Sequence, residues 1–351
     1  MRIEKKKSAM EQEIFEQPEI LNLILQTNID DNGSVNLTVP ENIEKVVLVA
    51  SGSSYHCARF AADLFGQIAH IEARAIYSSE FLLKSEVPHS PDILYVFVTQ
   101  SGETSDTNKA LNRAKEYGVQ TLAVTNKKES TIWNAADYKI DCRAGEEKSI
   151  AATKSLTSQL LCLTLLVMKY AAVKGFDVSD ITAGLRSLPD ELEKVYELRT
   201  QIGKIAKFLS KFKSIVVTAD GIFYALAKEA ALKIQETSYI NSNAIILGEF
   251  MHGHAAVLNS GNIPLIYVGD LNYTAIKNLN KIAADYNPCL VVLGGPNEKV
   301  KAKFEININC ENDIVKAFCI VVTEQLLALE IANKLRRNVD KPKGLDKVVT
   351  E

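Results

Sequence analysis

The stretch that decides the fold is Val46-Val47-Leu48-Val49-Ala50-Ser51-Gly52. Its β-branched and aliphatic run predicts a strand buried on both faces, its glycine predicts a turn, and the alanine-rich sequence after Tyr55 predicts a helix. The same pattern recurs as Ile215-Val216-Val217-Thr218-Ala219-Asp220-Gly221, with Tyr224 ahead of a second helix. The chain therefore contains the opening βα unit of a domain twice.

Further strands alternate with helices in both halves. In the first half we expect strands at 93–99 and 121–125, and in the second half at 263–268 and 289–293. Strands that alternate with helices imply parallel sheets with binding sites at the carboxyl ends of the strands. The predicted fold class is α/β, with two doubly wound, three-layer αβα domains in tandem.

The segments around these strands set the expected domain organisation. An acidic helical stretch breaks or restarts at Pro18, and a charged amphipathic segment predicts a connecting helix that starts near Pro189. The tail lacks periodicity, which is typical of disorder unless the tail folds over a site. The expected parts are an N-terminal helical segment at 1–38, a first domain at 39–195, a second at 200–337 and a tail at 338–351.

Composition excludes several classes of protein. The chain has 351 residues, 47% of them hydrophobic, and a net charge of −3, so it can bury a full core and carries no global positive field for a nucleic acid or an anionic membrane. The six cysteines are scattered without a C-x-x-C motif and predict buried free thiols of a reducing compartment. No secretory signal is evident, and the longest apolar run, 160–167, is too short to span a bilayer. We expect a cytoplasmic protein.

Several hydroxyl side chains lie in the connection between the second predicted strand of the first half and the helix that follows it. The stretch is Thr99-Gln100-Ser101-Gly102-Glu103-Thr104. Backbone N–H groups and the positive end of a helix point at whatever binds there, which suits a phosphate. An ordinary N-cap by Ser101 or Thr104 is the alternative. The corresponding stretch of the second half, 268–273, lacks the hydroxyl cluster, so we expect one such site per chain.

Other phosphate motifs are missing or ambiguous. The sequence has neither a G-x-x-x-x-G-K-[ST] nor a G-x-G-x-x-G motif, which disfavours a nucleotide ligand. Gly52-Ser53-Ser54-Tyr55 opens a helix, where Ser53 and Ser54 could serve as a cap or as hydroxyl ligands.

The second half supplies candidates for acid–base chemistry. Glu229, Lys233 and Glu236 share one stripe of a predicted helix, either as an exposed salt-bridged face or as a lysine that holds a general base in a cleft. His252 lies in a glycine-flanked loop and suits acid–base work, because histidine titrates near neutral pH. His254 offers no helical chelate with it, so no metal is expected.

These residues together resemble the double sugar-isomerase (SIS) domain family. The similarity is to the isomerase half of the glutamine:fructose-6-phosphate amidotransferases, or glucosamine-6-phosphate synthases, and to SIS-type glucosamine-6-phosphate deaminases. The resemblance implies a flavodoxin-like sheet in each half. The motifs that carry it, in the order of the family, are Glu16-Gln17-Pro18, 52–55, Ser79-Glu80-Phe81, 100–104, 151–154, 229–239, 248–253 and 340–351.

The resemblance implies a role for each matching position. The substrate phosphate would bind Gln100, Ser101 and Thr104, beside Ser54 and with Thr99 where relatives often have serine. The backbone at Ile150 and Ala151 would meet the sugar hydroxyls, although Ala152 replaces a serine of the family. The resemblance implies a further set of acid–base residues: Glu236 as the carboxylate that moves a proton between C1 and C2, Lys233 as its neighbour, His252 as the ring-opening group and Lys347 as the tail lysine over the sugar.

The same resemblance implies partners and a reaction. We expect a homodimer in which His252 enters the site of the other subunit, a phosphosugar ligand, and no cofactor. No glutaminase domain with a nucleophilic cysteine precedes the isomerase motifs, so the expected reaction is deamination of glucosamine 6-phosphate to fructose 6-phosphate and ammonia. Met251 and His254 depart from the residues common in the family, which leaves the preferred sugar less defined than the reaction type.

Other functions remain open from the sequence. The chain could be the isomerase part of a glucosamine-6-phosphate synthase, another phosphosugar isomerase or a fructosamine-phosphate deglycase. From a different class, it could be a phosphosugar sensor, although the short acidic N-terminal segment does not suit the helix-turn-helix of such regulators.

Overall fold

The computed structural model describes residues 7–260 and 263–348 of the chain. These residues form two compact units that interleave along the sequence. Unit 1 comprises residues 1–18, 148–153 and 187–345, and unit 2 comprises residues 19–147, 154–186 and 346–351. The expected N-terminal segment and tail reach beyond the described part, since 1–6 and 349–351 lie outside it.

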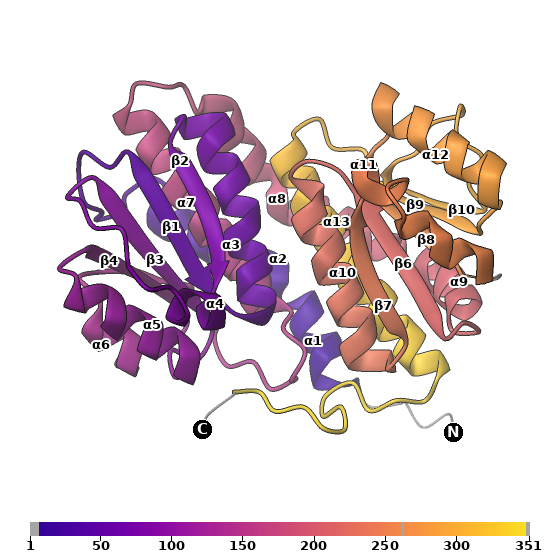
Figure 1. Ribbon diagram of the computed structural model, residues 1–351, viewed down its shortest axis with the longest axis horizontal. Helices are drawn as coiled ribbons and strands as arrows, with labels where there is room; N and C mark the ends of the chain where they lie inside the picture. Colours follow the sequence, from indigo (N-terminus) through magenta and orange to yellow (C-terminus); the bar gives the residue numbers. More distant parts are fainter. Residues whose placement is uncertain (1–6, 261–262, 349–351) are drawn as a thin grey trace. The chain divides into compact units, whose positions relative to one another are not determined.

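Unit 2 is built on a five-stranded parallel sheet in the order β2-β1-β3-β4-β5 (Figure 1). The order reverses between β1 and β3, and such a switch point leaves a crevice at the carboxyl ends of the two strands. The strands are β1 (Lys45–Ala50), β2 (Glu72–Tyr77), β3 (Ile93–Thr99), β4 (Gln120–Thr125) and β5 (Tyr138–Asp141).

Helices cover both faces of this sheet. Alternate residues such as Val47, Tyr95 and Phe97 form a buried core with one group of helices, and the residues between them face the other group. The first group is α4 (Ser78–Leu82), α5 (Ser105–Glu116) and α6 (Thr131–Ala135). The second is α3 (Gly52–Leu64), the π-turn η1 (Phe65–Ala69) and α7 (Lys154–Val173).

Unit 1 repeats the same topology. Its parallel sheet has the order β10-β9-β8-β6-β7, so β6 and β8 flank the switch point as β1 and β3 do in unit 2. The strands are β6 (Ser214–Ala219), β7 (Asn241–Ile246), β8 (Leu265–Asp270), β9 (Leu290–Gly295) and β10 (Phe304–Asn307).

The helices of unit 1 also form two layers (Figure 1). One layer packs on the core that contains Leu265, Tyr267 and Val292, and the other packs on the opposite face. The first comprises α11 (Leu247–Phe250), the 3-10 helix η2 (His254–Ser260) and α12 (Tyr273–Tyr286). The second comprises α9 (Arg199–Leu209), α10 (Phe223–Ser238) and α13 (Asp313–Lys334), with α1 (Ala9–Phe15) against α13.

Two helices carry the chain from one unit to the other, α2 (Gln17–Asn28) and α8 (Ser179–Glu197). The break between α1 and α2 at Glu16 confirms the interruption expected near Pro18. The expected start of a helix near Pro189 was wrong, because Pro189 lies inside α8. The fully buried stripe of Leu185, Leu188 and Leu192 stabilises this helix despite the N–H that proline lacks.

The predicted fold class is confirmed by the two parallel sheets and the helices on both faces of each. The described part contains one helix, α7, that is long and apolar enough to cross a membrane, with a mean hydropathy of 1.6 in its best window. Buried residues make up 83% of that window, as in the core helix of a globular unit.

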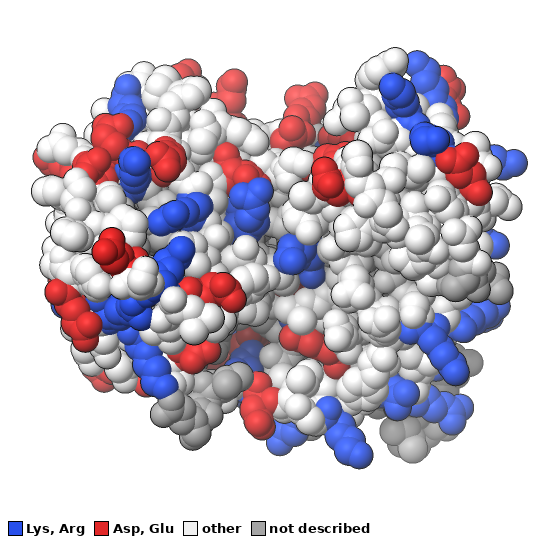
Figure 2. All heavy atoms as spheres, in the orientation of Figure 1, with Lys and Arg blue, Asp and Glu red and all other residues white. Residues whose placement is uncertain are grey.

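The cysteines and surface charges agree with the composition. All six cysteines are free thiols, and five of them are buried. Acidic and basic side chains are interspersed over the face that Figure 2 shows. A single-sign surface that would attract a polyanion is therefore absent from this face.

The described part of the C-terminal tail is held by defined contacts. Asp340 accepts hydrogen bonds from the backbone N–H groups of Ala9 and Met10, both at 2.9 Å, and so caps α1. Its carbonyl accepts from the Ile150 N–H at 3.1 Å. One tail residue thus holds an N-terminal helix and the segment 148–153 within unit 1.

Replacing Asp340 with Ala should loosen α1 and spare Ile150. Loss of a helix cap costs about 0.5–2 kcal/mol, so the amides of Ala9 and Met10 should exchange hydrogen faster. The Ile150 amide should stay protected, because its acceptor is a backbone carbonyl. Hydrogen exchange with mass spectrometry measures both, with the exposed Asp346→Ala as the control. Equal loss of protection at Ile150 and α1 would contradict the cap.

Candidate functional site

The loop between β3 and α5 has the geometry of an anion site. It leaves the sheet at the β1/β3 switch point, and its residues 100, 101 and 104 are half-buried. The hydroxyls of Thr99 and Thr104 are hydrogen-bonded to each other at 3.0 Å, and the Ser101 hydroxyl accepts from the Glu103 N–H at 3.1 Å. The hydroxyls expected from the sequence are therefore gathered in one turn.

Gly102 is required by the shape of this turn. It has φ +70°, in the left-handed region, and a Cβ at this position would lie 2.0 Å from the Ser130 Oγ. Its carbonyl accepts from the Ile132 N–H at 3.2 Å and from the Asn108 side chain at 3.1 Å. The loop backbone is thus pressed against α6 and held there.

The N-terminus of α5 is not closed by its own cap residue. Thr104 occupies the N-cap position but its side chain accepts no hydrogen bond from the first turn. The alternative of an ordinary side-chain cap at Thr104 was therefore wrong, because the Thr104 hydroxyl bonds to Thr99 instead. Glu103 turns the other way and accepts from the N–H and hydroxyl of Thr131 at 2.8 and 2.7 Å. An N-terminus with this arrangement suits a phosphate.

The β1–α3 turn lies at the same edge of the sheet. β1 and β3 are hydrogen-bonded neighbours, so the turn that carries Ser53 and Ser54 emerges beside the Thr99–Thr104 loop. Ser51, the N-cap of α3, makes no side-chain cap hydrogen bond. Tyr55 stacks on Tyr77 with ring centroids 3.5 Å apart, which fixes the first turn of α3.

The equivalent edge in unit 1 is occupied by the protein's own side chains. At the end of β8, Asp270 binds the Lys316 ammonium group with contacts of 2.9 and 2.7 Å. A Cβ on Gly269 would lie 2.7 Å from the ring of Phe223, which fills the space beside the strand. This confirms that the hydroxyl-rich loop of unit 2 has no counterpart among the described residues of unit 1.

The α10 stripe is a buried charge network. The Lys233 ammonium lies 3.3 Å from Glu229 and 2.5 Å from Glu236, and the side chains of Lys233 and Glu229 are almost fully buried. The alternative of an exposed salt-bridged face was therefore wrong. The Glu236 side chain retains 21% exposure, so it is the carboxylate of this network that a ligand can reach.

The surroundings of the network favour the charged form of Lys233 and the neutral form of a nearby acid, Glu324. Burial alone would lower the pKa of Lys233, but the carboxylates of Glu229 and Glu236 outweigh it and raise that pKa above the usual value. On α13, burial and the charge of Glu229 raise the pKa of Glu324 well above its usual range. Glu324 is buried, and neither of its oxygens has a hydrogen-bond partner among the residues that the structure describes, which favours its neutral form.

His252 lies in the turn after α11, also in unit 1. Its side chain is exposed, and its backbone N–H donates to the Glu249 carbonyl at 3.0 Å. Gly248, at the start of the same short helix, donates its N–H to Asp220 at 3.2 Å. The turn is thereby tied to the end of β6 while the imidazole stays accessible.

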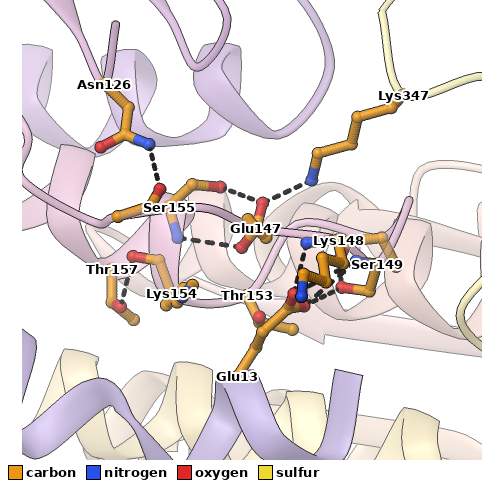
Figure 3. Close-up of polar contacts among 12 residues, drawn as sticks. Glu13, Asn126, Glu147, Lys148, Ser149, Thr153, Lys154, Ser155, Thr157 and Lys347 are labelled. Carbon is orange, nitrogen blue, oxygen red and sulfur yellow. Dashed lines mark hydrogen bonds and ion pairs between the residues drawn. The ribbon is translucent and has the colours of Figure 1, made fainter. Parts of the chain in front are cut away.

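The segment 148–153 is held from three directions within unit 1. The buried carboxylate of Glu13 accepts hydrogen bonds from the Lys148 N–H and from the N–H and hydroxyl of Ser149 (Figure 3). Gln325 on α13 donates to the Thr153 carbonyl at 3.2 Å. The Ile150 N–H donates to the Asp340 carbonyl of the tail at 3.1 Å.

Lys347 reaches a carboxylate of unit 2 that the sequence did not single out. Its ammonium lies 2.5 Å from Glu147, which also accepts from the Ser155 N–H at 3.0 Å and the Ser155 hydroxyl at 2.6 Å (Figure 3). Glu146-Glu147-Lys148 looks like a solvated charge run, and no signal in the sequence marks Glu147 as buried. The same is true of Glu13.

Fold and site together define a tandem flavodoxin-like protein with one hydroxyl-lined anion loop and one buried lysine–carboxylate network. The model of the SIS domain family matches residues 41–169 and 208–333, one match in each half. These matches cover more than half of the chain, which therefore belongs to the SIS domain family.

Two curated proteins are similar in sequence to this chain over nearly its whole length. Two are called glutamine–fructose-6-phosphate aminotransferase (isomerizing): one from Gloeobacter violaceus is 31% identical and one from Haemophilus influenzae is 32% identical, each over 97% of this chain. The chain spans 58% of the length of each.

Solved structures agree with this fold. The C-terminal domain of glucosamine-fructose-6-phosphate aminotransferase from Francisella tularensis has a TM-score of 0.90 and 25% identity, and covers 97% of this chain and 100% of its own. A structure described as glucosamine-6-phosphate deaminase, from Thermotoga maritima, has a TM-score of 0.78 at 21% identity, over 97% of this chain and 99% of its own, and supports the fold alone.

Replacing Gly102 with Ala should damage the anion loop. An alanine is strained at the left-handed φ of this position, and its Cβ would also overlap Ser130. Overpacking of this kind typically costs about 1–3 kcal/mol. Gly118→Ala is a matched control, because Gly118 has φ +68° with nothing within 4 Å of its Cβ. Thermal unfolding and protection by inorganic phosphate measure the two effects. A Gly102→Ala protein no less stable than the control would contradict the packing of this turn.

Proposed function

We propose that this chain is a phosphosugar isomerase of the SIS family that deaminates glucosamine 6-phosphate. Water and glucosamine 6-phosphate would give fructose 6-phosphate and ammonia. The observation that carries the proposal is the Glu229–Lys233–Glu236 network, in which one buried lysine pairs with two carboxylates and one of these is partly exposed. Isomerisation needs such a group to move a proton between adjacent carbons.

The phosphate ester would bind the loop between β3 and α5. Gln100, Ser101 and Thr104 would contact it through hydroxyl and backbone groups, with Thr99 holding Thr104 in place. Ser53 and Ser54 would contribute from the neighbouring turn. A dianionic phosphate is stabilised there by the α5 N-terminus, and its binding orients the rest of the sugar.

The acid–base steps would fall to groups of different character. His252 would open the pyranose ring, and Glu236 would transfer a proton from C2 to C1, giving an enolamine and then a ketose imine that water hydrolyses. Lys233 would hold the Glu236 carboxylate in position through their contact of 2.5 Å. The carbonyl of Ile150 and the backbone of Ala151 would contact the sugar hydroxyls, and Lys347 would act from the tail. The exposed His252 would serve the site of a partner in a homodimer.

A second function is supported by the named relatives. A chain that matches 58% of two isomerising aminotransferases could be the isomerase part of a glucosamine-6-phosphate synthase, which runs the same chemistry toward the amino sugar with ammonia supplied by a glutaminase. A plain aldose–ketose phosphosugar isomerase and a fructosamine-phosphate deglycase use the same groups without that ammonia.

A substrate panel separates these functions. The purified chain is incubated with glucosamine 6-phosphate, and ammonia and fructose 6-phosphate are measured. In the reverse arm it receives fructose 6-phosphate with an ammonium salt, and glucosamine 6-phosphate is measured. Release of ammonia supports the deaminase, and turnover in the reverse arm alone supports the synthase part. No turnover in either arm would overturn the proposal, and a fructosamine 6-phosphate arm detects the deglycase.

Glu236→Gln should remove turnover and keep ligand binding. The amide preserves the shape of the side chain but cannot take a proton, and loss of a general acid–base group lowers kcat by about 10²- to 10⁴-fold. Steady-state kinetics and calorimetric titration with the sugar phosphate measure both. Glu298→Gln, an exposed position of the same unit, is the control. Unchanged turnover in Glu236→Gln would show that another group transfers the proton, whereas ligand binding without turnover in the unsubstituted chain would identify a sensor.

A further inference from the structure

We propose that Glu147 is a positioning residue that anchors the C-terminal tail to unit 2 through the ammonium group of Lys347. The anchoring is a property of the chain without substrate. Its consequence for turnover rests on the proposed function, in which Lys347 acts on the sugar.

Glu147 is built to hold a cation. Its side chain is fully buried, while that of Lys347 keeps 24% exposure, so the lysine approaches the carboxylate from the surface. The N–H and hydroxyl of Ser155 orient the carboxylate from the start of α7. Burial alone would raise the pKa of Glu147, but Lys347 and Ser155 outweigh it and hold that pKa below its usual range. Figure 3 shows the Lys347 side chain descending from the tail onto this carboxylate.

The anchor is connected to the anion loop by hydrogen bonds within unit 2. The Asn126 N–H donates to the Gln100 carbonyl at 3.2 Å. The Asn126 side chain accepts from the Ala144 N–H and donates to the Gly145 carbonyl, both at 2.7 Å. Glu147 follows two residues later. The position of the Lys347 ammonium is therefore fixed relative to the proposed phosphate site by one unit alone.

Removing Lys347 and removing the charge of Glu147 should differ in their cost to the stability of the fold. Removing Lys347 would leave a buried carboxylate without its cation, whereas removing the charge of Glu147 would leave a lysine that can turn to water. Both changes break the same link between the tail and unit 2. Their effects on the tail should therefore coincide and should not add.

The test compares Glu147→Gln, Lys347→Gln and the double variant in the full chain. Hydrogen exchange of the amides at 343–348 is measured without substrate. Each single variant should exchange about ten- to a hundredfold faster there, as expected for loss of a hydrogen bond to a charged group, and the double variant should match the singles. Lys341→Gln, which removes an exposed tail charge that makes no ion pair among the described contacts, should leave the exchange unchanged.

Two results would overturn the proposal. One is unchanged tail exchange in Glu147→Gln, which leaves no buried charge unpaired and is therefore the variant expected to fold even where Lys347→Gln does not. The other is additive acceleration in the double variant. With the sugar phosphate, Glu147→Gln should lower kcat as far as Lys347→Gln does, with KM unchanged. Because the exchange is measured without substrate, a failed assay would count against the proposed function and leave the anchor standing.

Discussion

A charge that is buried in a protein must be paired, and this constraint shapes each part of the candidate site. Glu13, Glu147 and Glu229 are all buried acids: Glu13 accepts from the segment 148–153, Glu147 pairs with Lys347, and Glu229 pairs with Lys233. Pairing of this kind stabilises the fold little, because desolvation offsets the attraction. It does fix geometry, since leaving either partner alone is costly. The acids thereby set where the segment 148–153, the tail lysine and Glu236 lie.

The two halves share one topology and differ at one place. In unit 2 the switch point opens into a turn of hydroxyls and an α5 N-terminus whose cap residue points elsewhere. In unit 1 the same edge is closed by the Asp270–Lys316 pair and the ring of Phe223. In the same unit α10, the helix after the first strand, carries the buried charge network at 229–236, beyond the residues that correspond to the serine turn of unit 2.

Much of this could be predicted from the sequence because the signals are local. β-branched runs that end at glycine predicted the central strands, and the hydroxyls of 99–104 predicted the anion loop. The sequence did not predict the edge strands β2, β5, β7 and β10. Their mixed, half-exposed sequences lack the continuous apolar run of a central strand. Glu13 and Glu147 escaped for another reason. Whether a carboxylate is buried depends on donors far away in the chain, such as Lys347, and no local pattern encodes that.

The burial of Glu324 beside Glu229 bears on how Lys233 is shared within the network on α10. Burial and the charge of Glu229 raise the pKa of Glu324, which favours its neutral form, and of the two carboxylates that contact Lys233 only that of Glu236 has solvent access. Were Glu324 ionised as well, a third negative charge beside Glu229 would compete for Lys233 and favour a proton on one of the acids. The buried acid on α13 therefore leaves Lys233 to its neighbours on α10, and Glu236 is the carboxylate of the network that solvent reaches.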